Sequence, residues 1–205
     1  IEDFAKGKTN ILCGTQLVSK GLDFDKVGLV GVVDADSMLF YPDFRAYERC
    51  FDMLTQVAGR SGRGDKVGKV IIQTYNPLHQ IFQEVANHNY RNMYNAQIVE
   101  RKLFRYPPFY HLVKINLQSK DINLLNEFAD TYAMKIRGIF GGRILGPEFP
   151  AVSKIRNLFI KTIILKLERT VSYAKAKQAI MRLNEEMLAS PSGKQMRIIT
   201  DVDPQ

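Results

Sequence analysis

Residues 56–64 read Gln-Val-Ala-Gly-Arg-Ser-Gly-Arg-Gly and follow a segment with the period of an amphipathic helix. Arg60 and Arg63 stand three residues apart among small residues. A guanidinium group is always charged, and its planar fork of donors fits phosphate oxygens. The neighbouring glycines let a polyphosphate approach the backbone. The stretch therefore indicates a phosphate clamp at the end of a helix. A solvated basic loop is the alternative, and it would be the better interpretation of an isolated Arg-x-x-Arg.

Gln56, four residues before Arg60, makes the pattern more specific. Gln-x-x-Gly-Arg-x-Gly-Arg resembles the last signature motif of superfamily 2 helicases. In that family the motif lies on the second RecA-like lobe and reaches nucleotide held by the first lobe. The resemblance implies that Arg63 stabilises charge on the transferred phosphoryl group, as arginine fingers do. It also implies that Arg60 supports Arg63 and that Gln56 couples the nucleotide to the lobe interface.

A second motif lies upstream, after the apolar segment 10–13, which is predicted to form a short buried strand. The loop that begins at Gly14 is rich in hydroxyl, amide and small residues, which can contact DNA phosphates without reading sequence. It resembles the fifth helicase motif, in the Gly-Thr-Gln-x-x-x-Lys-Gly form of primosomal helicases. The resemblance implies DNA contacts for Thr15, Gln16 and Lys20, and nucleotide contacts for Gly21 and Asp23.

The sequence contains no loop that would hold nucleotide tightly. Gly7-Lys8-Thr9 matches the end of a Walker A motif, but Glu2 stands where that motif needs another glycine. No other Gly-x-x-x-x-Gly-Lys-Ser/Thr occurs in the chain, and no Walker B candidate is present. We therefore expect ATP and Mg²⁺ to be bound mainly by a lobe outside this chain, and the chain alone to hydrolyse no ATP. The start at Ile1 rather than Met also suggests an excised fragment.

Composition indicates an ordinary folded protein of one large or two small domains. The chain has 205 residues, 45% hydrophobic and 24% charged. No apolar run approaches the roughly 18 residues of a membrane span, and no signal peptide is visible. Cys13 and Cys50 lie far apart in apolar surroundings without partners at zinc spacing, so buried free thiols, a reducing cytoplasmic compartment and no bound metal are expected.

The positive charge is concentrated in the second half of the chain. The net charge is +8, and residues 109–205 hold 15 of the 29 lysines and arginines but only 9 of the 21 acids. Such a balance favours an anionic partner, with nucleic acid first. A charge that serves solubility alone is the other possibility.

Hydrophobic patterning divides the chain into three parts. Residues 1–76 show β-branched strands at 27–33 and 67–74 with a helix from Pro42 between them, which is an α/β pattern with a parallel sheet. Residues 77–108 are predicted to be a helical connector that ends at a double proline. Residues 109–205 are predicted to form a separate domain.

The predicted second domain follows the order β-α-β-β-α-β, which indicates an α+β split-βαβ sandwich. Its strands are expected at 111–117, 144–145, 158–167 and 197–202, and its helices at 121–136 and 171–188. Lys154, Arg156 and Lys161 cluster before and within the third strand. On this clustering of charge they are the candidate DNA phosphate contacts.

The whole chain resembles the PriA family of primosomal replication-restart helicases. The second half carries the resemblance through Tyr106-Pro107-Pro108-Phe109, Leu145-Gly146-Pro147 and the closing Asp201-Val202-Asp203-Pro204-Gln205. Two positions depart from the family pattern: Leu22 stands where histidine is usual, and Ile160 where arginine is usual. The second departure weakens the assignment of a particular DNA contact on that strand.

The resemblance implies a second RecA-like lobe followed by a DNA-binding domain, both from an ATP-dependent 3′–5′ DNA helicase that recognises stalled forks and promotes primosome assembly. It implies branched and single-stranded DNA, single-strand-binding protein and other primosome proteins as partners. Zinc belongs to cysteines of such a parent protein and not to this chain. Two alternatives stay open. One is a non-enzymatic module that binds DNA or single-strand-binding protein; the other is the second lobe of a different superfamily 2 helicase such as RecG.

Overall fold

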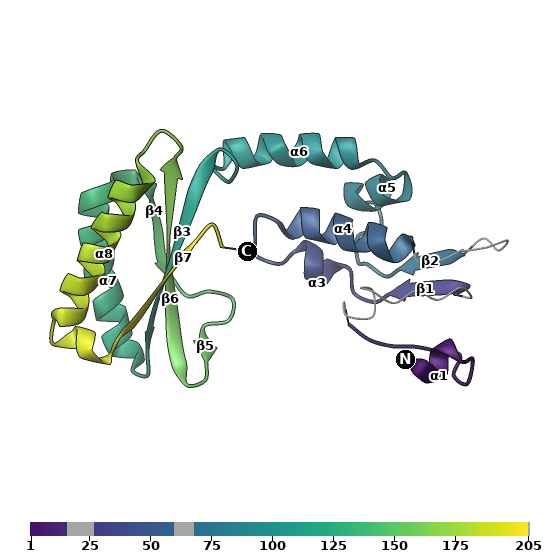
Figure 1. Cartoon of the computed structure of the whole chain (residues 1–205), viewed down its shortest axis with the longest axis horizontal. Helices are drawn as coiled ribbons and strands as arrows, with labels where there is room; N and C mark the ends of the chain where they lie inside the picture. Colours follow the sequence, from purple (N-terminus) through teal and green to yellow (C-terminus); the bar gives the residue numbers. More distant parts are fainter. Residues whose placement is uncertain (16–26, 60–67, 205) are drawn as a thin grey trace. The chain divides into compact units, whose positions relative to one another are not determined.

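The computed structural model describes residues 1–15, 27–59 and 68–204, and it divides into two compact units, Ile1–Val99 and the part from Glu100 onward (Figure 1). The elements of the first unit are α1 (Glu2–Ala5), β1 (Leu29–Val32), α3 (Asp36–Leu39), α4 (Ala46–Ala58), β2 (Lys69–Ile72) and α5 (Gln80–Ala86). Helix α6 (Tyr90–Leu103) begins in the first unit and ends in the second.

The first unit is built on a parallel strand pair joined through helices. β1 and β2 pair from Leu29 opposite Lys69 to Val32 opposite Ile72. Parallel pairing requires a crossover, which α3 and α4 supply. One face of the strand pair packs on a core of α4 and α5 side chains that includes Phe51, Leu54 and Ile81. On the other face Leu29 and Ile71 are exposed.

Three local predictions for the first unit are wrong. Residues 10–13 are not in a strand, and Ile11 is exposed. An apolar run forms a strand only where a neighbouring segment offers backbone partners. Cys13 is exposed rather than buried. The helix starts at Ala46 and not at Pro42, because the Asp43 carboxylate accepts a hydrogen bond from the Arg45 amide and holds these residues in a turn.

The second unit has the predicted strand and helix order, with one short strand added. Its elements are β3 (Tyr110–Ser119), α7 (Ile122–Phe140), η1 (Gly141–Arg143), β4 (Ile144–Glu148), β5 (Lys154–Ile155), β6 (Leu158–Glu168), α8 (Tyr173–Ala189), η2 (Ser192–Gln195) and β7 (Arg197–Val202). The sheet order is β4-β6-β3-β7, with β5 paired to β6, and every pairing is antiparallel.

Both long helices of the second unit cover the same face of this sheet (Figure 1). Alternate residues of the central strands, such as Ile115 and Ile163, point into a core with Phe128, Tyr132 and Leu183 from the helices. The fold class expected from the sequence is thereby confirmed: a parallel α/β part precedes an α+β sandwich of split-βαβ order.

Candidate functional site

The end of α4 positions Gln56. The helix buries Phe51, Leu54 and Val57 against the core, so Gln56 is turned to solvent on the last helical turn. The amide of Gly59 donates to the Thr55 carbonyl at 3.0 Å and closes the helix. The chain then enters residues 60–67. Arg60 and Arg63 lie outside the described residues, so their catalytic roles stay predictions.

The upstream motif is described only up to its second residue. Thr15 is exposed, which suits a contact with an external strand of DNA. Gln16, Lys20, Gly21 and Asp23 lie outside the described residues, and their assignments to DNA and nucleotide stay predictions.

Two carboxylates at the carboxyl end of β1 are occupied by structural hydrogen bonds. Asp36 is 8% exposed and accepts hydrogen bonds from the Thr74 hydroxyl and the Tyr75 amide, both at 2.9 Å. Asp34 accepts one from the Ser37 amide at 3.2 Å. These bonds tie the segments that follow β1 and β2 together.

The second unit presents a short β-hairpin that carries the three cations expected to contact DNA. β5 and β6 pair through Lys154 opposite Phe159, and the Ile160 amide extends the ladder by donating to the Ser153 carbonyl at 2.9 Å. Arg156 and Asn157 form the turn with φ angles of 47° and 64°. Positive φ at both central residues is typical of the two-residue hairpin turn whose twist matches that of the strands. The backbone that carries the three cations therefore has a regular hairpin conformation.

Two of the hairpin cations lie over aromatic rings. The Lys154 ammonium lies 4.4 Å from the centroid of the Phe159 ring, and the Lys161 ammonium lies 5.2 Å from that of Phe149. These distances are in the range of cation–π attraction. Phe159 packs partly into the core, whereas Phe149 is 45% exposed.

Strand register adds three cations that the sequence did not indicate. Gln118 lies opposite both Ile160 and Arg197, so the start of β7 lies at the same end of the sheet as the hairpin. Lys120 directly follows β3, and Lys194 lies in η2 just before β7. These residues are far apart in the sequence, and only the pairing of strands shows that they belong to one end of the sheet.

We call this group the basic end of the second unit: Lys120, Lys154, Arg156, Lys161, Lys194 and Arg197. Five of the six are exposed and Lys161 is half-buried. Within the described part of the chain none of them forms an ion pair. The nearby carboxylate of Asp121 caps α7 by accepting from the Asn123 and Leu124 amides. An excess of unpaired positive charge therefore remains at this end.

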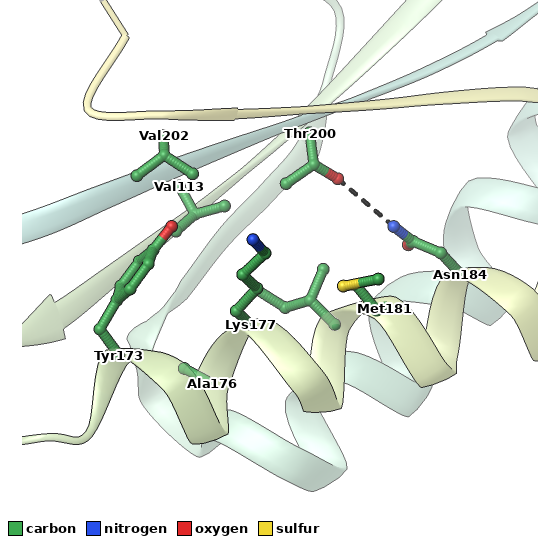
Figure 2. A pocket seen from close by; sticks show the side chains of 9 residues that line it. Val113, Tyr173, Ala176, Lys177, Met181, Asn184, Thr200 and Val202 are labelled. Atoms are coloured by element: carbon green, nitrogen blue, oxygen red, sulfur yellow. Dashed lines mark hydrogen bonds between the residues drawn. The ribbon is translucent and has the colours of Figure 1, made fainter.

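A groove of about 310 Å³ lies elsewhere in the second unit, between α8 and the edge strand β7. Figure 2 shows Tyr173, Lys177 and Met181 along α8, facing Thr200 and Val202 of β7. Asn184 donates to the Thr200 hydroxyl at 3.3 Å and accepts from Tyr132 at 2.6 Å. Burial raises the pKa of the Tyr132 hydroxyl, which stays a neutral donor.

Residues 1–15, 27–59 and 68–204 contain no group of three or more His, Cys, Asp or Glu that could hold a metal ion. None of the helices formed by those residues is long and apolar enough to cross a membrane.

Known protein families match both parts of the chain. Residues 102–205 match the primosomal protein N C-terminal domain, and residues 1–65 match the helicase conserved C-terminal domain. The chain belongs to the PriA family. Its members named replication restart protein PriA include those of Bacillus subtilis, 34% identical over 98% of this chain, and of Haemophilus influenzae, 35% identical over all of it. A third, from Synechocystis, is 34% identical over all of it.

The chain spans about a quarter of the length of these PriA relatives, since it covers 25%, 24% and 28% of them. The match of the second unit to the PriA family separates this chain from helicases that share only the first part. It confirms the family resemblance that the sequence motifs indicated.

Proposed function

We propose that this chain is the C-terminal part of an ATP-dependent 3′–5′ DNA helicase that acts at stalled replication forks and promotes primosome assembly. Membership of the PriA family supports the proposal, since the related proteins are named for replication restart. Single-strand-binding protein and other primosome proteins would be its partners, in the cytoplasm. The activity would belong to the longer protein, because this sequence has no phosphate-binding loop.

In the proposed helicase the first unit would complete a nucleotide-binding site that is formed mostly by another lobe. Gln56 fits this role because it is exposed at the point where α4 delivers the chain to the two arginines. Arg63 would stabilise charge on the phosphoryl group, and Arg60 would support it. Bound ATP with Mg²⁺ would supply the phosphoryl group that is transferred to water. Zinc would be held by other parts of the longer protein.

The second unit would grip DNA through its basic end. The observation that carries this part of the proposal is that six cations without ion pairs in the described part of the chain lie at one end of the sheet, three of them on the hairpin of β5 and β6. Cations that neutralise phosphates release counterions, which gives affinity without sequence preference. A module that binds DNA without enzymatic activity is the description that suits this chain by itself.

Fluorescence anisotropy with labelled DNA at several salt concentrations tests the DNA role. The triple variant Lys154→Gln, Arg156→Gln and Lys161→Gln is expected to bind at least about tenfold more weakly, with a salt slope smaller by about 2 to 3. The matched control removes the same charge from α8 through Lys175→Gln, Lys177→Gln and Arg182→Gln, and it is expected to keep most of the affinity. Equal losses in both variants would mean that net charge alone attracts DNA.

A further inference from the structure

Exposed apolar side chains lie next to cations of the basic end. Phe149, Val152 and Ile155 are 45%, 58% and 51% exposed, and they lie in the hairpin or in the segment leading to it. Contacts with DNA phosphates require cations and hydrogen-bond donors and make no use of these side chains. A ligand that covers this surface has to offer apolar or aromatic area together with negative charge.

Phe149 and Lys161 present a ring and a cation next to each other. The ammonium lies 5.2 Å from the ring centroid, so it occupies one side of the ring while nearly half of the residue stays exposed. Pro150 follows and restricts the backbone beside the ring. A nucleotide carries the matching pair, a flat base and a phosphate one sugar apart. The neighbouring Phe159 is less suited, because it packs partly into the core.

The exposed ring distinguishes unpaired from paired DNA. In a duplex the faces of the bases are stacked on one another and only their edges reach the grooves. In a single strand the faces are free to stack on an aromatic side chain. We infer that Phe149 is a stacking platform for an unpaired base whose phosphates are held by Lys161 and its neighbours. This inference rests on the proposed DNA binding and assigns it to single-stranded DNA.

The absence of tryptophan from the whole sequence provides a direct test. Phe149→Trp places the sole tryptophan of the chain at the proposed platform. We expect its emission to be strongly quenched by a short oligo(dT) strand and to change little with a blunt duplex of equal length. The control Met134→Trp places the sole tryptophan at a 68% exposed position of α7, and its emission should not respond to either DNA.

A second pair of variants tests how much the Phe149 ring contributes to the affinity for single-stranded DNA. Phe149→Ala is expected to weaken oligo(dT) binding about 5- to 20-fold and duplex binding less than about twofold. Phe149→Leu keeps apolar area without a π face and should behave like the alanine variant. Thermal melts serve as the folding control, and both variants are expected to melt close to the parent chain because the Phe149 side chain lies outside the buried core.

Three outcomes would overturn the inference. In the first, anisotropy shows saturation with oligo(dT) while the emission of Phe149→Trp stays unchanged. In the second, Phe149→Ala weakens single-strand and duplex binding equally. In the third, an acidic peptide quenches the tryptophan and displaces DNA, which would make the surface a protein-docking site. Absence of any anisotropy change with all DNA would instead contradict the DNA role proposed above.

Discussion

The Asp36 carboxylate stands where a ligand-binding residue would be expected, but both of its oxygens accept hydrogen bonds from the protein itself. It follows strand β1 at the carboxyl end of the sheet, which is where α/β proteins bind ligands. Its two oxygens nevertheless accept from Thr74 and Tyr75, so it joins two loops. Its negative charge also acts on Cys50, which lies in the adjoining core.

Cys50 and Cys13 should differ sharply in reactivity. Burial, and secondarily Asp36, raises the pKa of Cys50 from 9.0 to about 11, whereas Cys13 is exposed. At pH 8 we expect a disulfide reagent such as Ellman's reagent to modify one thiol in the native chain and two in denaturant, because the thiolate is the reactive form. Rapid modification of two thiols in the native chain would contradict this assignment.

The raised pKa of Cys50 also predicts how the stability of the folded chain changes with pH. Because the folded-state pKa is raised, the unfolded state loses this proton first as the pH rises. The neutral thiol therefore makes its full contribution to the free energy of unfolding below about pH 9, and this contribution is lost as the pH rises toward about 11. Cys50→Ala should remove this part of the alkaline destabilisation.

At the scale of elements, the end of α8 depends on close backbone packing. A Cβ atom added at Gly193 in η2 would lie 2.2 Å from the Met187 carbonyl oxygen and 2.7 Å from Leu188 backbone atoms. Backbone atoms at a helix end cannot move aside as a flexible side chain can. The tight passage from α8 through η2 sets the start of β7, and with it the position of Arg197.

Gly193→Ala is therefore expected to lower the free energy of unfolding by about 1–3 kcal/mol, the cost of overpacking. Chemical denaturation of the purified chain measures this quantity. Gly142→Ala is the matched control, since a Cβ there would meet nothing within 4 Å. Similar stability of the two variants would show that the backbone around Gly193 relaxes.

Local pattern predicted long elements well and short ones poorly. The strands and helices of the second unit were predictable because their hydrophobic patterns are long. Alternation over the ten residues of β3 and the helical period over α7 stay recognisable even where single residues depart from the pattern. The prediction of a strand at 10–13 was wrong, because the three apolar residues of that segment do not show whether a pairing partner exists. The two-residue strand β5 gave no periodic signal at all.

At the scale of the whole molecule, the sequence combines motifs that resemble those of helicases with the lack of a loop that would hold nucleotide tightly. We expect the purified chain to release no phosphate from Mg²⁺–ATP above background, with or without single-stranded DNA. An arginine finger stabilises a transition state only where another element holds the phosphates. A continuous phosphate-release assay measures the rate, with Arg63→Ala as control. DNA-stimulated release that this variant abolishes would contradict the expectation.

The residues proposed for the site differ in how far sequence could predict them. The arginine motif and the Gly-Thr-Gln loop were recognisable from fixed spacing, since their chemistry depends on residues close together in the chain. Lys154 and Arg156 were recognisable as a charge cluster. Lys120, Lys194 and Arg197 were not, since each stands in a separate segment with an ordinary charge pattern.

The sequence by itself determined the family, the order of strands and helices in the second unit, and the local motifs, because these depend on residue spacing within one segment. Only the tertiary structure decided which segments lie side by side. The antiparallel register of β3 with β6 and β7 brings distant cations to one end of the sheet. The turn between β5 and β6 places Lys154 over Phe159. Register is set by hydrogen bonds and core packing between segments far apart in the chain, so no single segment encodes it.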